Sequence, residues 1–259
     1  MVFKNYANYY DLLYQDKNYI AESEYISSII KKYLTNAKKI LEFGSGSGIH
    51  GRLLSKLGYK VSGIERSQEM IDLGNQNSGP KIRDSKFKCV LGDCKDTFIC
   101  NDFDVVISLF HVLSYQISEK SITAIFKNAH RQLKPGAIMI FDFWYAPAVW
   151  NCRPTLRLKK VENTELKITR IAEPRCWEDK NRVDVQYLTF VEDLSSGHIS
   201  KIEETHKMRA FDLDEINRFS SATGFDLLHS EEWLSRQSPS ATTWGVCSVL
   251  KKSTSTTIE

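Results

Sequence analysis

The segment at residues 38–51, KKILEFGSGSGIHG, constrains the fold of this chain more than any other part of it. An apolar, strand-like run leads into glycines at alternate positions and then into a helix-like stretch. A turn with so few side chains lets a ligand pass very close to the main chain. The helix that follows offers free N–H groups and the positive end of its dipole to an anionic or carboxylate-bearing group. The segment therefore predicts a strand, a glycine turn and a helix that bind a cofactor.

Short apolar runs rich in β-forming residues recur beyond this segment, with helix-like stretches between them. They lie at 59–65, 86–93, 103–110 and 136–143. This alternation predicts βαβ units and a parallel sheet that helices cover on both faces.

The pattern changes after residue 143. Four segments that alternate apolar and polar residues predict an antiparallel meander, and they lie at 156–162, 165–173, 182–192 and 198–211. Two later apolar runs, 225–234 and 242–252, would return to the edge of the parallel sheet, so the meander is an insertion after strand five. We therefore expect an α/β fold that is Rossmann-like and doubly wound, with a mostly parallel seven-stranded sheet.

This organisation predicts three units. The first is an N-terminal helical cap or lid over 1–35, where apolar residues recur at helical spacing. The second is a Rossmann-like cofactor-binding domain over 36–145 and 210–252. The third is the antiparallel β insertion over 146–209. The polar end of the chain, 253–259, is expected to fray.

Charge and composition argue against several classes of partner. The formal net charge is +3 and the basic residues are scattered among acids, so a nucleic-acid partner has little support. No apolar run is long enough to span a bilayer, and the first residues lack the apolar core of a signal peptide, which predicts a cytoplasmic protein with no membrane partner. The six cysteines form no CxxC pair and have no histidine at zinc-ligand spacing, so we expect reduced thiols and no metal site.

The glycines alone do not name the cofactor. Gly46-x-Gly48-x-x-Gly51 also fits the dinucleotide-binding fingerprint, so the turn is compatible with both NAD and S-adenosylmethionine. Acids at the ends of consecutive predicted strands distinguish the two, because ligands of such sheets bind at the carboxyl ends of the strands.

Three carboxylates stand at these strand ends. Glu42 is placed to meet the cationic amino group of a methionine moiety, which NAD lacks. Glu65 follows the glycines by about 20 residues, where an acid hydrogen-bonds a ribose diol. Asp93 follows Gly92 and can accept a hydrogen bond from the adenine amine. Each acid also has a structural interpretation: Glu42 as a cap of the turn, Glu65 as a cap of the next helix beside Ser67, and Asp93 as part of an ordinary turn. Their joint occurrence favours S-adenosylmethionine.

The sequence resembles class I S-adenosylmethionine-dependent methyltransferases, with Glu42-x-Gly44-x-Gly46-x-Gly48 as motif I, Glu65 as the ribose ligand and Gly92-Asp93 on the adenine side. The opening segments 10–14 and 16–19, together with the insertion, are similar to the branch of deoxyamino-sugar N,N-dimethyltransferases. That likeness implies that the N-terminal tyrosines fold over the cofactor. It also implies that the inserted sheet supports either dimerisation, as a homodimer, or the substrate side of the site.

By this resemblance Tyr10 would lie near the sulfonium and the backbone around Leu109 would touch the cofactor. The residues expected to bind the cofactor are Tyr10, Glu42, Gly44, Ser45, Gly46, Gly48, Glu65, Arg66, Met70, Asp93, Cys94 and Leu109.

The acceptor side is less defined. Where amino-sugar enzymes of this branch can carry a histidine near the acceptor amine, Tyr115 stands at the matching step and His111 lies earlier in the segment. These two are the candidate catalytic residues, against the simpler interpretations of a satisfied histidine at a strand end and a tyrosine packed on a helix face. The residues expected to contact the substrate are Tyr14, Tyr19, Trp144, Trp150 and Arg175.

Tyrosines crowd the start of the chain, at Tyr6, Tyr9, Tyr10, Tyr14 and Tyr19. Such rings can cover a pocket and exclude water, or they can simply pack a helix on the body of the protein. We favour the covering role.

Methyl transfer from a sulfonium is an in-line displacement that needs a well-aimed lone pair and a dry pocket. The expected function is methylation of a small molecule, most specifically of the amino group of a nucleotide-linked deoxyamino sugar. O-methylation of a sugar or other metabolite, an NAD-dependent oxidoreductase, and a module that binds S-adenosylmethionine without turnover are the alternatives.

Overall fold

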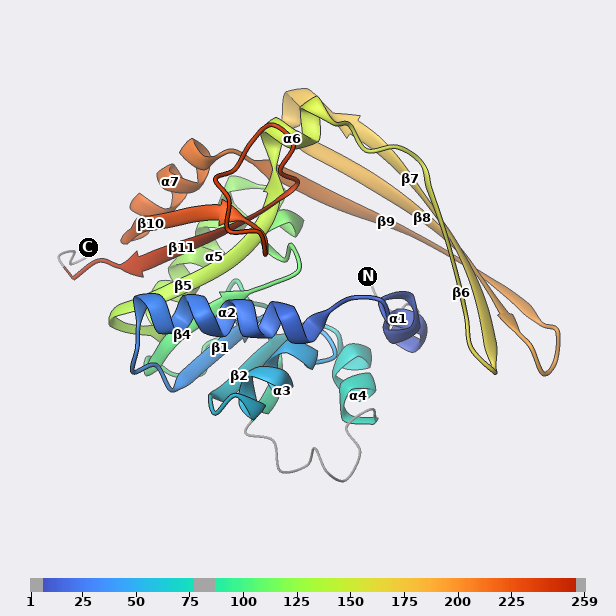
Figure 1. Ribbon diagram of the computed structural model, residues 1–259, viewed down its shortest axis with the longest axis horizontal. Coiled ribbons are helices and arrows are strands. Elements are labelled where there is room, and N and C mark those ends of the chain that lie inside the picture. Colours follow the sequence, from blue (N-terminus) through green and yellow to red (C-terminus); the bar gives the residue numbers. More distant parts are fainter. Residues whose placement is uncertain (1–6, 77–86, 255–259) are drawn as a thin grey trace.

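A computed structural model describes residues 7–76 and 87–254 of the chain (Figure 1). Its helices are α1 (Ala7–Leu13), α2 (Tyr19–Tyr33), α3 (Ile49–Lys56), α4 (Gln68–Gln76), α5 (Glu119–Gln132), α6 (Ala146–Asn151) and α7 (Leu213–Ser221), with the short 3-10 helices η2 (Leu113–Tyr115) and η3 (Glu178–Lys180). Its strands are β1 (Lys39–Phe43), β2 (Lys60–Glu65), β3 (Phe87–Leu91), β4 (Phe103–Ser108), β5 (Leu133–Tyr145), β6 (Arg157–Glu162), β7 (Leu166–Trp177), β8 (Arg182–Asp193), β9 (Ile199–Phe211), β10 (Phe225–Glu232) and β11 (Gly245–Lys252).

Seven of these strands form the central sheet, in the order β3-β2-β1-β4-β5-β11-β10. Strands β1 to β5 pair in parallel, whereas β11 runs antiparallel to both β5 and β10. Parallel neighbours joined by helical crossovers bring the carboxyl ends of the strands to one edge of the sheet. The predicted Rossmann-like α/β fold with a seven-stranded sheet is thereby confirmed.

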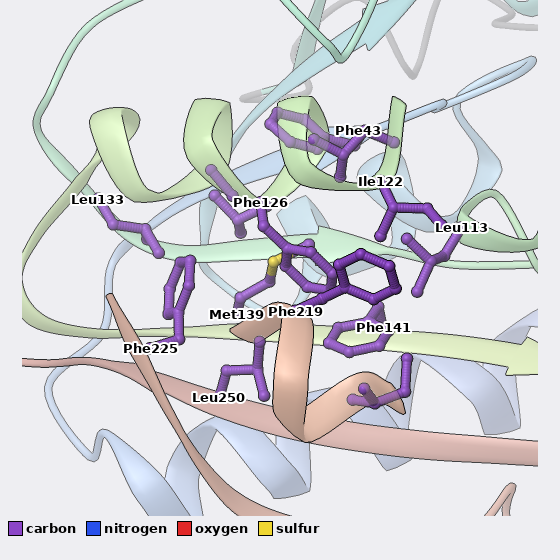
Figure 2. Packing of buried hydrophobic residues seen from close by; sticks show 14 of the residues in the cluster. Phe43, Leu113, Ile122, Phe126, Leu133, Met139, Phe141, Phe219, Phe225 and Leu250 are labelled. Carbon is purple, nitrogen blue, oxygen red and sulfur yellow. The ribbon is translucent and has the colours of Figure 1, made fainter. Parts of the chain in front are cut away.

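The alternation of side chains along β1 divides the core into two layers. Ile40 belongs to the cluster that packs under α2 and α3, whereas Leu41 and Phe43 belong to the cluster that packs under α5 and α7. Figure 2 shows the second layer, where Phe126 of α5 lies against Phe141 of β5 with ring centroids 5.5 Å apart. Each fully buried phenylalanine contributes roughly 1.5–3 kcal/mol relative to an exposed position. These two layers fix the strand ends that carry the site.

The inserted strands β6 to β9 form an antiparallel sheet that extends away from this body (Figure 1). The sheet is attached at one end, where Trp144 and Tyr145 of β5 pair in parallel with Ala210 and Phe211 of β9. An apolar cluster between α6 and strands β8 and β9 fills this joint. The insertion is thus held by the strand end that faces the ligand edge of the central sheet.

The N-terminal segment divides between the two sheets. Helix α2 packs on the central sheet, and its first turn is capped by Asn18, whose side chain accepts a hydrogen bond from Ala21 N at 3.0 Å. Helix α1 lies beside the insertion instead, where Tyr9 and Leu13 are buried with residues of β7 and β8. The single cap predicted over 1–35 therefore consists of two helices on different supports.

The frayed end predicted at 253–259 lies largely outside the described residues, which end at 254. Within the ranges that the structure describes, none of the helices combines the length and apolar character needed to cross a membrane.

Candidate active site

A cavity of about 690 Å³ opens at the carboxyl ends of the parallel strands. Its walls come from the glycine turn after β1, the ends of β2 and β3, the loop after β4, the end of β5, the N-terminal tyrosines and the inner face of the inserted sheet. Ligand sites of this kind commonly measure a few hundred to 1,000 Å³. The cavity thus joins elements that lie far apart in the sequence.

The glycine turn forms the floor of one half of the cavity. Gly46 has a φ of 56°, in the left-handed region, and a Cβ built on it would meet only the Met70 side chain, at 3.4 Å. The space above it belongs to the cavity, so a side chain there would occupy the ligand's path. Gly48 differs, because it precedes α3 with a φ of 74° and a Cβ on it would strike the Phe87 ring at 2.5 Å. Gly48 therefore allows tight packing and does not line the cavity.

Glu42 is the most deeply buried of the three predicted acids, with 2% of its surface exposed. Burial and the neighbouring Glu65 raise the pKa of the Glu42 carboxyl to about 8, against a smaller opposing effect of Arg52 and the Gly51 backbone. Its Oε2 atom has no hydrogen-bond partner among the residues that the structure describes. A buried carboxylate without a partner is costly, and a primary ammonium group would satisfy it.

Glu65 lies where it could serve both roles considered for it, that of a ribose ligand and that of a cap for the next helix. Its Oε2 accepts a hydrogen bond from Gly46 N at 2.9 Å, and its Oε1 accepts one from Ser67 N at 2.9 Å. The Ser67 hydroxyl in turn accepts from Met70 N at 3.2 Å, in the first turn of α4. Glu65 thus ties the glycine turn to the next helix while it faces the cavity, and each carboxylate oxygen keeps a second lone pair for a ribose hydroxyl.

Asp93 also takes part in a local turn. Its Oδ1 accepts a hydrogen bond from Lys95 N at 3.0 Å, and its Oδ2 lies 3.1 Å from Lys95 Nζ. The loop behind it is held by Asn128 of α5, whose amide nitrogen donates to Cys94 O and Thr97 O, both at 2.9 Å. The sequence did not single out Asn128, because a polar residue within a helix has no motif that marks it.

His111 stands in a strained loop immediately after β4. Phe110 and His111 both have left-handed φ values, 64° and 62°, at a cost on the order of 1–2 kcal/mol each. Asp142 of β5, 2% exposed, compensates by accepting a hydrogen bond from His111 N at 3.0 Å. The ring Nδ1 lies 2.8 Å from the other Asp142 oxygen, at an ion-pair distance but poorly aligned for a hydrogen bond. Backbone strain held in place by a buried carboxylate is typical of functional loops.

Tyr115 is joined to the inserted sheet. Its hydroxyl lies 2.8 Å from Nδ1 of His206 on β9, and Nε2 of His206 lies 3.1 Å from Oε2 of Glu204. Burial, with the nearby Tyr187 as a smaller cause, raises the pKa of Tyr115 well above its ordinary value. His206 and Glu204 were not predicted from the sequence, although an inward-facing histidine among the alternating residues of a strand is an available signal.

Aromatic rings line the wall opposite the glycine turn. Trp144 and Trp244 meet edge to face with ring centroids 5.8 Å apart, and both line the cavity together with Tyr187. Trp150 and Arg175, which were also predicted to contact the substrate, do not line the cavity.

Trp150 donates its indole N–H to Asn181 Oδ1 at 3.1 Å in the joint of the insertion. Arg175 is exposed beside Trp177. Neither residue lines the cavity, because the pleat of β7 and the packing of α6 turn these side chains away from it.

The N-terminal tyrosines serve both roles considered for them. Tyr10, Tyr14 and Tyr19 line the cavity, and Tyr14 meets Phe110 edge to face with centroids 5.2 Å apart. Tyr9 instead packs against the inserted sheet. Tyr6 lies outside the described residues.

The structure therefore brings most of the predicted site residues together. Both candidate catalytic residues line the cavity, as do the predicted substrate residues Tyr14, Tyr19 and Trp144. Of the predicted cofactor residues, those that line it are Tyr10, Glu42, Gly44, Ser45, Gly46, Glu65, Arg66, Met70, Asp93, Cys94 and Leu109. Among the described side chains, His, Cys, Asp and Glu form no cluster of three or more that could hold a metal ion.

Comparison with known proteins agrees with this geometry. Residues 40–136 match the family model described as a methyltransferase domain. The chain is 22% identical over 224 residues to dTDP-3-amino-3,6-dideoxy-alpha-D-glucopyranose N,N-dimethyltransferase of Streptomyces fradiae, with 85% of this chain and 84% of the relative covered.

Solved structures share the fold over nearly the whole chain. An S-adenosylmethionine-dependent methyltransferase from Clostridium acetobutylicum superposes with a TM-score of 0.80 at 18% identity, covering 96% of this chain and 98% of that one. An S-adenosylmethionine-bound amino pentose methyltransferase from Micromonospora echinaspora superposes with a TM-score of 0.74 at 18% identity, covering 98% of both chains. The matched domain, the glycine turn and the curated relatives support an S-adenosylmethionine-dependent methyltransferase, and the solved structures show its Rossmann-like fold.

Proposed function

We propose that this methyltransferase acts on the amino group of a nucleotide-linked deoxyamino sugar. The observation that carries the proposal is that one cavity runs from the glycine turn to an aromatic wall, which is formed by Trp144 at the end of β5, Trp244 before β11 and Tyr187 of the inserted sheet. Three of the curated relatives, all at 22–24% identity, carry names of dTDP-amino-sugar N,N-dimethyltransferases. The superposition on the amino pentose methyltransferase covers 98% of this chain, so it includes most of the insertion, which contributes Tyr187 to the aromatic wall.

The donor half of the cavity has the residues that S-adenosylmethionine requires. Glu42 would pair with the ammonium group of the methionine end, the main chain at Gly46 would pass close to it, and Glu65 would accept from the ribose. Asp93 would accept from the adenine amine. When bound, the cofactor supplies a methyl group activated by a sulfonium.

On the acceptor side, the protein's task is to position a nitrogen lone pair and exclude water. Tyr10 and Tyr14 would cover the reacting atoms, while Trp144 and Trp244 would hold the sugar ring by its apolar face. His111 and Tyr115 are the polar groups placed to contact the acceptor. An amine acceptor needs to lose only one proton before attack, so a modest base suffices.

One observation favours O-methylation as a second candidate. Nδ1 of His111 lies at an ion-pair distance of 2.8 Å from the buried Asp142 carboxylate, and a hydroxyl acceptor depends on a nearby base more than an amine acceptor does. In that case His111 would be essential at every pH.

The deciding experiment is incubation with methyl-deuterated S-adenosylmethionine and dTDP-3-amino-3,6-dideoxy-α-D-glucopyranose, followed by mass spectrometry of the product and its fragments. The matched control replaces the amino group of the sugar with a hydroxyl. We expect label on the amine and none on the control. Label confined to a hydroxyl would overturn the proposal in favour of O-methylation.

A further inference from the structure

Three polar side chains form a chain that leads from the cavity into the inserted sheet. The Tyr115 hydroxyl contacts Nδ1 of His206 at 2.8 Å, and Nε2 of His206 contacts Oε2 of Glu204 at 3.1 Å. Tyr115 lies in η2, just after β4, whereas the other two residues are two positions apart on β9. Tyr115 and His206 both line the cavity.

The order of the groups fixes the direction of their hydrogen bonds. An ionised carboxylate can only accept, so Nε2 of His206 carries the hydrogen and donates it to Glu204. Nδ1 is then the lone-pair nitrogen, and the Tyr115 hydroxyl donates to it. A phenol oxygen that donates its own hydrogen retains the capacity to accept another one from a ligand.

Aromatic side chains surround this row of three hydrogen-bonded groups. His206 is 4% exposed, and the Tyr187 ring of β8 meets its ring at a centroid distance of 4.7 Å. Burial, with the nearby Glu204 carboxylate as a smaller cause, raises the pKa of Tyr9 in α1.

Other titratable and charged groups face the same place. Tyr14, which follows α1, and Arg66, which follows β2, act on Tyr115 from the cavity side. Arg170 of β7 lies over Tyr187 at 4.9 Å.

We propose that Tyr115, His206 and Glu204 form a proton relay that removes the proton from the acceptor ammonium before methyl transfer. This inference rests on the proposed N-methylation and assigns it a route for the proton. The substrate N–H bond breaks, its electron pair stays on nitrogen, and its proton joins the Tyr115 oxygen as the tyrosine's own hydrogen passes to Nδ1 of His206. The imidazolium that results is stabilised by Glu204.

The methyl transfer that follows needs no further reagent. The freed nitrogen lone pair forms the new C–N bond as the C–S bond breaks and sulfur keeps its electron pair. The product leaves as an N-methylammonium ion, and the relay loses its proton to solvent between turnovers. A second methylation needs the same proton removal from the N-methylammonium ion.

The relay makes a prediction that a purely structural role does not. His206→Gln should lower kcat/KM for dTDP-3-amino-3,6-dideoxy-α-D-glucopyranose by about 100-fold near neutral pH. The loss should shrink as pH rises toward about 9.5, where the amine arrives already neutral. Affinity for S-adenosylmethionine should stay within about twofold of the wild type, because the relay lies on the acceptor side. Tyr115→Phe should give the same pH profile, and Glu204→Gln a smaller loss.

The chain offers a matched control. His229 of β10 contacts Glu231 two residues away at 2.8 Å, the same local arrangement, and neither residue lines the cavity. His229→Gln should leave the pH profile of the wild type unchanged. A loss in His206→Gln that is equal at every pH, or no loss at all, would overturn the relay while leaving the proposed N-methylation in place.

A second measurement does not depend on the acceptor. Nitrogen-15 NMR of labelled histidine, assigned with His206→Gln, should show the neutral ring hydrogen of His206 on Nε2. A ring hydrogen on Nδ1 would contradict the relay's direction. Failure of the wild type to methylate the amino sugar while it binds S-adenosylmethionine would instead contradict the proposed function, so the two failures are distinguishable.

Discussion

The donor and acceptor halves of the cavity are built in different ways. The donor half comes from consecutive strand ends and the short loops that follow them, and its acids are joined by backbone hydrogen bonds such as that from Gly46 N to Glu65. The acceptor half combines a loop after β4, the end of β5 and an inserted sheet whose residues lie about 90 positions from their partners, as His206 does from Tyr115. Residues close together in the sequence determine the geometry of the donor half, whereas packing between residues far apart in the sequence determines that of the acceptor half.

Because the two halves are built differently, substitutions in them should have different effects. A change in the donor half disturbs a turn that other residues depend on, so it should affect cofactor affinity whatever the acceptor is. The inserted sheet pairs with the central sheet at Trp144 and Tyr145, so its inward-facing side chains can change without altering the strand ends that we propose hold the cofactor. Fold and cofactor therefore do not determine the acceptor.

The largest effect that would test this separation is expected at the glycine turn. Gly46→Val places a branched side chain at a left-handed position and in the path of the cofactor, and we expect S-adenosylmethionine affinity to fall by at least about 100-fold. Isothermal titration calorimetry measures it. Gly197→Val is the control, because Gly197 has a φ of 70° in the turn between β8 and β9 with open space around it. Equal loss of affinity in the two variants would mean that backbone strain, and not the cofactor's approach, is responsible.

A smaller effect follows from Glu42. Below its pKa of about 8 this carboxyl is protonated in the free protein, whereas pairing with an ammonium group requires the ionised form. Binding should therefore release a proton, and S-adenosylmethionine affinity should fall by up to about tenfold for each unit that pH drops below 8. Calorimetry in two buffers of different ionisation enthalpy counts the released proton. In Glu42→Gln the proton release should vanish and affinity should be weaker and less dependent on pH. A pH-independent affinity in the wild type would show that Glu42 does not meet the cofactor's amino group.

The smallest effect is expected on the aromatic wall. Trp144→Ala should raise KM for the amino-sugar acceptor by about tenfold, through the loss of roughly 1–2 kcal/mol of ring contact, with S-adenosylmethionine affinity unchanged. Steady-state kinetics with each substrate varied in turn distinguishes an effect on the acceptor KM from an effect on S-adenosylmethionine binding. Trp177→Ala removes a tryptophan at the end of β7 that does not line the cavity, and it should change neither constant. An altered cofactor affinity in Trp144→Ala would show that the two halves are coupled.

Most residues predicted for the donor half line the cavity, because the signals that mark them are local. The spacing of Glu42, the glycines, Glu65 and Asp93 lies within single βα units, where a strand, its turn and its helix determine one another. The same spacing did not distinguish Gly46, which faces the cavity, from Gly48, which packs against Phe87. That distinction depends on a ring from β3, far along the chain.

The acceptor half was predicted only in part, for the same physical reason. Asp142, His206 and Glu204 carry no motif, and their partners are chosen by strand register and by the angle of the inserted sheet. Trp150 and Arg175 were placed in the site from residue type alone, and strand pleat and helix packing direct them elsewhere. The division of the N-terminal cap between two sheets likewise depends on a surface that the insertion creates.

The central claim is that the carboxylates at the strand ends and the bare glycine turn hold a single S-adenosylmethionine molecule. Titration calorimetry of S-adenosylmethionine with Glu65→Ala tests it most directly, because this acid both orients Gly46 and faces the ribose position. We expect at least about tenfold weaker binding than in the wild type, because one or two charge-assisted hydrogen bonds are lost. An unchanged dissociation constant in a folded Glu65→Ala variant would contradict it.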